Sequence, residues 1–156
     1  MQISIDVEMI TIPAGPFLMS EQLQSVELPE YRIAKYPVTH VEYDRFVQAT
    51  GHRRPDHWSK DGSYPPHLAR HPVVFVSWDD AVAYTQWLGA RLPSEAEWEK
   101  AARGIDGRLY PWGNEFLAAN CNSSESGTDG IRPVDAHPGG ASPYGVMDMA
   151  GNVWEW

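Results

Sequence analysis

The sequence predicts a loop-rich fold in which a few short strands precede three short helices. Glycine and proline number 13 each among 156 residues, together about 17% against a usual ~12%, an excess that excludes a simple helical bundle. A β-branched segment bounded by turn residues lies near the start of the chain, which is typical of a strand. Three serine or threonine residues each stand three positions before an acidic residue, which is typical of a helix N-terminus.

The strands are expected in the first 40 residues. Met9–Ile12 is β-branched and is followed by the turn residues 13–16. Residues 17–19 are expected to be the return strand of a hairpin with it. Residues 26–38 space large apolar side chains among polar ones, and one further strand is expected there.

Three helices are expected, each beginning at a capping box. The pairs that mark them are Thr39 with Glu42, Ser77 with Asp80, and Ser94 with Glu97, and the glycines that end them are Gly51, Gly89 and Gly104. Trp78, Trp87 and Trp98 recur at helical spacing and are assigned to the core. Residues 52–72 are expected to form an ordered loop, and no helical period survives after residue 109. Residues 1–156 read as a single domain.

Charge and cysteine content exclude several classes of protein. Acidic residues outnumber basic ones by 21 to 12, for a net charge of −9, which argues against binding of nucleic acid or an anionic membrane. Divalent cations or a cationic partner fit this balance. A single cysteine, Cys121, excludes an intrachain disulfide and a cysteine-rich zinc site. No apolar run is long enough to span a membrane, and residues 1–8 lack signal-peptide features, so the chain as written is expected to be cytoplasmic.

Eight segments, taken in order, resemble the sulfatase-modifying-factor family, also called the formylglycine-generating-enzyme type. They are residues 12–19, 36–39, 72–81, 91–104, 110–114, 133–134, 144–145 and 148–156. Each motif is weak alone, but the series covers nearly the whole chain and is very specific. The resemblance implies an irregular, loop-rich α+β fold related to C-type lectin domains and held partly by calcium.

The resemblance implies a calcium site in residues 148–156. Its ligands would be the carboxylates of Asp148 and Glu155 and the backbone carbonyls of Gly151 and Val153. Calcium takes six to eight oxygen ligands, which carboxylates and carbonyls supply. The residues alone favour a different interpretation, in which the two acidic residues cap turns while Trp154 and Trp156 fill the core.

A second calcium site of the family would fall in residues 120–129. Asn120 with the Cys121 carbonyl, or Asn122 with the Ser123 carbonyl, would begin it, and Asp129 would close it. The alternative is a solvated loop held by local hydrogen bonds from asparagine and serine side chains.

Two further groups of residues have a less specific pattern. His67 and His71 are four residues apart, as in a metal-binding helix, but the prolines around them favour an ordinary loop. Arg91, Glu97 and Arg103 are expected to form charge pairs.

The family's enzymes oxidise a cysteine of a client sulfatase to formylglycine, using O₂ and a copper ion held by two cysteines. Cys121 matches neither of these, and a lone thiol cannot supply the two thiolates that Cu(I) prefers. Cys121 is therefore expected to be a packed or loop residue with no special reactivity. The chain is expected to be the N-terminal part of such a domain, truncated at its C-terminal side, and copper would enter only if a further C-terminal segment supplied a cysteine pair.

A non-catalytic, calcium-stabilised binding or accessory module on the same scaffold is the alternative function. The two tryptophans at the end of the chain predict an exposed apolar surface there. Self-association through this surface, a complementing chain and a client protein are the expected partners.

Overall fold

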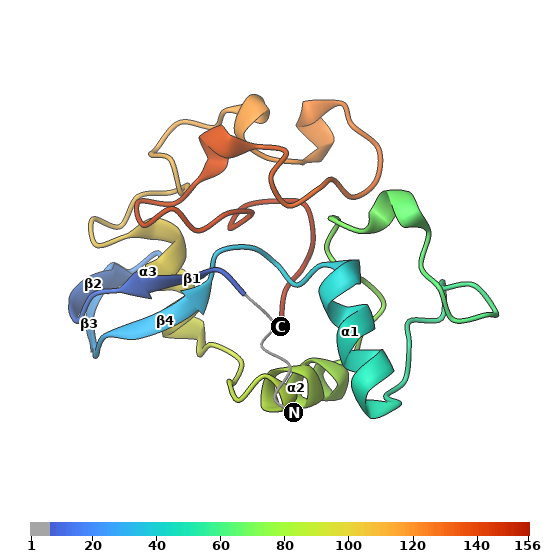
Figure 1. Cartoon of the computed structure of the whole chain (residues 1–156). Helices are drawn as coiled ribbons and strands as arrows, with labels where there is room; N and C mark the ends of the chain where they lie inside the picture. Colours follow the sequence, from blue (N-terminus) through green and yellow to red (C-terminus); the bar gives the residue numbers. More distant parts are fainter. Residues whose placement is uncertain (1–6) are drawn as a thin grey trace.

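The computed structural model describes residues 7–156, in which four short strands precede three α-helices and a long segment of loops and 3₁₀ turns (Figure 1). The expectation that residues 1–8 lack signal-peptide features falls mostly on residues 1–6, which lie outside the described residues. The strands gather on one side of the molecule and α1 (His40–Thr50) lies on the other, with α2 (Trp78–Trp87) below it. The loop-rich α+β class expected from the sequence is confirmed.

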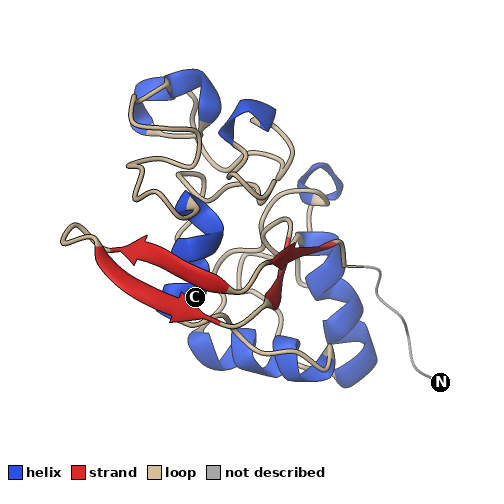
Figure 2. Cartoon of the chain, turned by 90° about the vertical axis from the view of Figure 1, so that its left-hand side faces the viewer, coloured by secondary structure: helices blue, strands red, loops and turns tan. Residues whose placement is uncertain are grey.

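The four strands form one long antiparallel hairpin with a gap in its middle (Figure 2). β1 (Met9–Ile12) pairs with β4 (Tyr31–Ala34), and β2 (Gly15–Met19) pairs with β3 (Gln24–Leu28). The residue numbers of every pair add to the same total, so the register does not change across the gap. Pro13 and Pro29 both lie in the gap, where a proline cannot donate a ladder hydrogen bond.

This arrangement corrects two expectations for the strands. Residues 17–19 do lie in a strand, β2, but this strand continues the arm of β1 and pairs with β3, so it is not the return strand of a hairpin with the first strand. The single strand expected over residues 26–38 is two strands, which begin earlier, at Gln24, and end at Ala34. Pro29 interrupts the strand, because it removes a backbone donor.

All three helices begin as expected. The side chains of Thr39, Ser77 and Ser94 each accept a hydrogen bond from the backbone N–H three residues further on, and each capping box is complete. α1 ends at Gly51, whose φ of 72° is left-handed, and α3 (Glu95–Arg103) ends at Gly104. These helix boundaries therefore follow from local sequence.

Two apolar clusters make up the core. One joins the strand ribbon, α3 and the loop near the end of the chain, and contains Ile12, Ala101, Ala102, Val146 and Met149. The other joins α1, α2 and the loop that follows α1, and contains Tyr43, Phe46, Trp58 and Tyr84.

Trp98 packs against the first cluster and Trp87 against the second, as the sequence predicts. The assignment of Trp78 to the core is wrong, since this side chain is 54% exposed. At 3.6 residues per turn, Trp78 lies about two and a half turns before Trp87 and so faces the opposite side of α2.

Residues 52–72 form the ordered loop expected between α1 and α2, with one short 3₁₀ turn at Pro66–Leu68. Backbone hydrogen bonds tie the end of this loop to the start of α1, from His40 N–H to the His71 carbonyl at 3.0 Å and from Val73 N–H to the Val38 carbonyl at 2.8 Å. After α3, regular structure is limited to 3₁₀ turns at Ala118–Asn120, Ser124–Ser126 and Pro138–Gly140.

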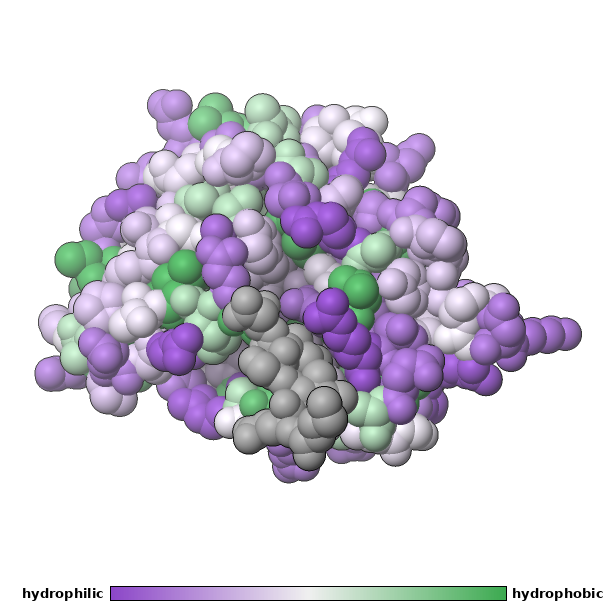
Figure 3. All heavy atoms as spheres, viewed as in Figure 1, coloured by the Kyte–Doolittle hydropathy of each residue, from purple (hydrophilic) through white to green (hydrophobic). Residues whose placement is uncertain are grey.

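The face shown in Figure 3 is mainly hydrophilic, with hydrophobic residues in small separate areas. None of the helices within residues 7–156 has the length and apolar character needed to cross a membrane.

Candidate functional site

Asn152 joins the two loops in which the sequence predicts calcium sites. Its Nδ2 donates to the Asp148 carboxylate at 2.9 Å and to the Arg132 carbonyl at 3.1 Å. Its Oδ1 accepts from the Asn122 side chain at 3.0 Å and from the Arg132 backbone N–H at 2.9 Å. Sequence reasoning missed Asn152, although an asparagine after a glycine is a signal for the left-handed turn it adopts.

The turn around Asn152 depends on left-handed backbone at three positions. Asp148, Gly151 and Asn152 have φ values of 56°, 83° and 66°. A Cβ on Gly151 would lie 2.5 Å from the Asn122 carbonyl oxygen, and the same carbonyl accepts the Asn152 N–H at 2.9 Å. Glycine at 151 therefore lets the two loops approach closely.

Asp148 is a buried carboxylate with little to compensate its charge. The residue is 7% exposed, accepts one side-chain hydrogen bond, from the neutral amide of Asn152, and forms no ion pair within residues 7–156. Burial raises the pKa of Asp148, and the Asn152 hydrogen bond and the nearby His137 oppose this only in part. A bound cation would satisfy such a group, so the chemistry of Asp148 fits the calcium site that the sequence predicts.

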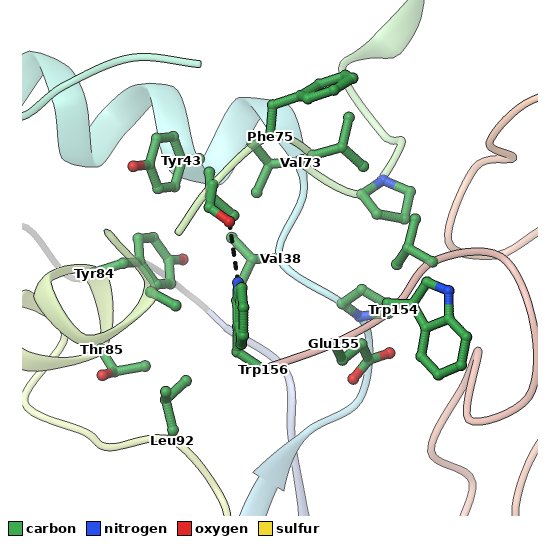
Figure 4. Close-up of a pocket in the computed structure, with 16 residues that line it drawn as sticks. Val38, Tyr43, Val73, Phe75, Tyr84, Thr85, Leu92, Trp154, Glu155 and Trp156 are labelled. Atoms are coloured by element: carbon green, nitrogen blue, oxygen red, sulfur yellow. Dashed lines mark hydrogen bonds between the residues drawn. The ribbon is translucent and has the colours of Figure 1, made fainter. Parts of the chain in front are cut away.

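Glu155 points in a different direction. Its carboxylate accepts a hydrogen bond from Trp98 Nε1 at 3.1 Å and lies between the side chains of Trp154 and Trp156 (Figure 4). It is open to solvent on one side yet closely surrounded by protein on the others, and this desolvation raises its pKa to about 7. The described part of the chain contains no group of three or more histidine, cysteine or acidic residues that could hold a metal ion.

The loop 120–129 is held by neutral side chains. Asn122 donates to the Gly130 carbonyl at 2.9 Å and accepts from the Thr128 hydroxyl at 2.6 Å, while the Ser123 carbonyl accepts from the Ser126 hydroxyl at 2.6 Å. Asn120 closes a 3₁₀ turn and is half-buried, and Asp129 is exposed. Cys121 is 4% exposed, which confirms that it is a packed residue.

The other polar residues singled out in the sequence lie apart from this region. His67 is exposed within the turn Pro66–Leu68, and His71 follows that turn, so no continuous helix face presents both imidazoles. Arg91 holds the Glu97 carboxylate with two hydrogen bonds of 2.7 Å, and this pair lowers the pKa of Glu97 to about 2.

Arg103 is in a charge pair as expected, but its partner is Glu99, at 2.6 Å, one turn earlier on α3. The Glu99 carboxylate also accepts the Ser20 backbone N–H at 2.6 Å, so this pair fixes the turn of the strand ribbon to the helix.

An apolar groove of about 490 Å³ lies beside the end of the chain. Figure 4 shows Val38, Tyr43, Val73 and Tyr84 along its walls and Trp156 at its centre. Trp156 Nε1 donates to the Val76 carbonyl at 3.0 Å, which fixes the indole in place. Trp154 is fully exposed and Trp156 is 58% exposed, so the interpretation that these two side chains fill the core is wrong.

Comparison with known proteins identifies one domain family that covers nearly the whole chain. Residues 4–156 match the family model described as the sulfatase-modifying factor enzyme 1-like domain. The formylglycine-generating enzyme of Thermomonospora curvata is 34% identical over 214 residues, which covers 95% of this chain and 70% of that protein. The mouse formylglycine-generating enzyme is 32% identical, and the match covers 96% of this chain but 57% of the mouse protein.

The solved structure of CarF has the same fold, with a TM-score of 0.69 over 96% of this chain and 79% of that one. Its sequence identity of 24% supports a shared fold only.

Proposed function

Because the chain belongs to the sulfatase-modifying factor enzyme 1-like domain family, we propose that it is a formylglycine-generating-enzyme-like domain that binds calcium and a client protein but does not oxidise cysteine by itself. The observation that carries the last point is the cysteine content: Cys121 is the one cysteine among 156 residues, and its side chain is buried.

The residues present do not fit the copper site of the family's enzymes. That site needs two thiolates, which a soft Cu(I) ion prefers. Cys121 can supply one, but its Cβ packs beside Gly151, 3.3 Å from the position that a Cβ there would take, and no second cysteine exists to join it. The described residues therefore serve as a scaffold, and we derive no oxidation step from them.

An activity assay tests the absence of oxidation. The 156-residue chain is incubated with a cysteine-containing sulfatase peptide, copper, O₂ and a thiol reductant, and the peptide mass is followed. We expect no formation of the aldehyde. An aldehyde product that appears with the wild-type chain and disappears with Cys121→Ser would overturn the proposal, because it would show that one thiol is sufficient.

The calcium site that we propose uses Asp148, Gly151, Val153 and Glu155. The buried, uncompensated carboxylate of Asp148 supports it, as does the left-handed turn that Asn152 holds in place. Glu155 would have to exchange its hydrogen bond from Trp98 for the ion. Asn120, Cys121, Asn122, Ser123 and Asp129 stay the candidates for a second calcium site.

Thermal unfolding with and without Ca²⁺ tests these sites. A ligand at about 100 times its Kd stabilises the native state by about 2.7 kcal/mol, which for a chain of this length raises Tm by about 5–10 °C. The double variant Asp148→Asn/Glu155→Gln should lose the shift, and the exposed control Asp56→Asn should keep it. A full Tm shift in the double variant would contradict this site. If the double variant keeps the shift and Asn122→Ala loses it, calcium binding is assigned to the loop 120–129.

A non-catalytic binding module is the second candidate function. It is favoured by the apolar groove, which leaves three aromatic side chains, those of Phe75, Trp154 and Trp156, open to solvent. Large exposed apolar areas on a folded domain mark interaction sites.

A further inference from the structure

Residues 56–64, which we call the flap, form the middle of the ordered loop between α1 and α2. Figure 1 shows the loop that follows α1 extending from the right-hand side of the molecule, away from the strands. Inside the flap, Ser59 N–H donates to the Ser63 carbonyl at 2.9 Å and Gly62 N–H donates to the Ser59 carbonyl at 2.8 Å. Because these bonds lie within the flap, a movement of the whole flap would not break them.

Within the described residues, one hydrogen bond joins the flap to a distant part of the chain. Trp58 Nε1 donates to His40 Nδ1, at the start of α1, at 3.1 Å. The other outward bonds of the flap go to residues directly before it, Arg53 and Pro55. Trp58 is 6% exposed, and the other side chains of the flap are exposed or half-buried. A segment held by so few contacts opens at a lower free-energy cost than the core does.

Both ends of the flap are fixed by contacts that mild acid does not break. Before the flap, the Asp80 carboxylate lies 2.9 Å from His52 Nε2 and 2.6 Å from Arg53 Nη2. Burial opposes the ionisation of Asp80, but the hydrogen bonds that it accepts outweigh burial and lower its pKa. After the flap, backbone N–H groups of α1 donate to the carbonyls of Ala69 and His71, and such bonds do not titrate. The flap can therefore move between two fixed ends.

The bond between the flap and α1 requires a neutral His40. This side chain is fully buried, and a proton on Nδ1 would remove the lone pair that accepts the Trp58 N–H. The titratable groups that face the ring are two imidazoles and a phenol, those of His57, His71 and Tyr64. The carboxylates of Glu42 on α1 and Asp80 on α2 already accept hydrogen bonds from other residues. A charged His40 is therefore stable only where water reaches it, which requires that the flap move away.

From this arrangement we propose that residues 56–64 are an acid-operated flap, which opens as a unit between its two fixed ends when His40 takes up a proton. Opening would uncover the Trp58 indole, the His40 ring and the part of Tyr43 against which Trp58 packs, at 6.2 Å between ring centroids. Acid would thus convert a closed surface into an open aromatic one. No flap residue lines the groove beside the chain end or belongs to the calcium loops, so the proposal stands apart from the proposed function.

The size of the effect follows from how tightly the closed and open states bind the proton. Burial, and then the two neighbouring histidines, lower the pKa of His40 to about 4 in the closed state, whereas the ordinary value is 6.5. The open state should therefore gain about 50-fold over the closed state between pH ~7 and pH ~4.5.

Hydrogen exchange of the Trp58 indole N–H, followed by NMR on the 156-residue chain, tests the proposal. This proton exchanges only when its bond to His40 opens, so its protection relative to free tryptophan reports how often the flap opens. We expect its protection to be at least about tenfold lower than that of the central α3 amides and insensitive to low concentrations of urea. It should fall by about 50-fold from pH ~7 to pH ~4.5.

Two variants and a second indole are the controls. His40→Asn should lose the fall in protection, because asparagine keeps an acceptor and has no proton to gain. His57→Asn, which removes an exposed histidine of the flap, should retain it. The Trp112 indole donates to the Glu115 carbonyl at 2.8 Å, and its protection should not fall in the same way.

Three outcomes would overturn the proposal. The Trp58 indole could match the α3 amides in protection and in urea dependence, which would mean that the flap opens only when the whole domain unfolds. Its protection could stay constant with pH, or it could fall equally in His40→Asn, and either result would exclude His40 as the trigger. The comparison of Trp58 with α3 uses the wild-type chain alone, so it decides the proposal even if His40→Asn does not fold.

Discussion

Acid should destabilise this protein through His40, the first residue of α1, whose side chain is fully buried. Trp58 Nε1 donates a hydrogen bond to His40 Nδ1 at 3.1 Å. An indole N–H can only donate, so Nδ1 carries a lone pair and the neutral ring has its proton on Nε2. That Nε2 has no hydrogen-bond partner within residues 7–156.

A second proton on His40 would break the Trp58 bond and place a charge in the core. The nearby titratable groups are His57, whose ring centroid is 5.2 Å away, and His71, together with the phenol of Tyr64, and none of them is an acid that could balance the charge near neutral pH. Burial, and then the two neighbouring histidines, lower the pKa of His40 to about 4.

The direction of the pH effect follows from linkage. The pKa of His40 is lower in the folded chain than the ordinary 6.5, so the unfolded chain binds more protons between these values. The contribution to stability is complete above pH ~6.5 and is lost as the pH falls towards ~4, by about 2–3 kcal/mol at pH ~4.5. Glu155 acts in the opposite direction, because its folded pKa is raised to about 7.

Urea unfolding followed by tryptophan fluorescence at neutral and mildly acidic pH measures the effect. His40→Asn keeps an acceptor for Trp58, because the asparagine Oδ1 lies where Nδ1 does, and it has nothing to titrate. Its free energy of unfolding should change with pH by about 2–3 kcal/mol less than that of the wild type. His67→Asn, at an exposed histidine, should behave as the wild type. The reasoning is refuted if His40→Asn retains the wild-type pH dependence, since Glu155 and the other groups are common to both chains.

Two further substitutions test buried polar contacts. Asn152→Ala removes four hydrogen bonds between the loops at 122, 132 and 148 and should lower the free energy of unfolding by about 2–4 kcal/mol. The control Asn114→Ala removes one exposed hydrogen bond, from the Leu109 N–H, and should lower it by less than about 1 kcal/mol. Equal effects of the two substitutions would contradict the linking role of Asn152. Lys100→Met leaves the carbonyls of Pro13 and Gly15 without their donor and should lower the free energy of unfolding in urea by about 2 kcal/mol. The control Lys35→Met, at the exposed pair with Glu8, should lower it by less than about 1 kcal/mol. An unchanged free energy of unfolding in Lys100→Met would show that water replaces the ammonium.

The elements that the sequence predicts well are those whose determinants lie within a few residues. A capping box needs two side chains three positions apart, and all three helices begin where Thr39, Ser77 and Ser94 place them. Strand pairing depends on residues far apart in the chain, and there the prediction chose the wrong partner for residues 17–19. The exposure of Trp78 was predictable from helical geometry, because the buried residues Asp80 and Tyr84 lie on the other side of α2.

In the candidate site, too, local sequence predicts some features, while others depend on residues far apart in the chain. The motif around residues 148–156 predicts that Asp148 is a calcium ligand, while its burial is a finding of the structure alone. The link from Asn152 to Asn122 spans 30 residues and has no sequence signal beyond the turn. The groove beside Trp156 is likewise formed by segments near residues 38, 75, 84 and 155, and no periodicity within one segment could reveal it.

Buried polar side chains in this fold lie where regular hydrogen bonding stops. Lys100 donates to the carbonyls of Pro13 and Gly15 at 2.7 and 2.9 Å, at the gap that the prolines leave in the hairpin. Asn122 and Asn152 likewise donate to the backbone carbonyls of Gly130 and Arg132, in the part of the described chain after α3 whose only helices or strands are 3₁₀ turns. A loop-rich chain must satisfy its buried backbone groups with side chains, since it has few ladders to do so. Asp148 differs from these donors because it brings a negative charge to such a joint without a cation, and this is why calcium, and not further packing, is the partner we propose for it.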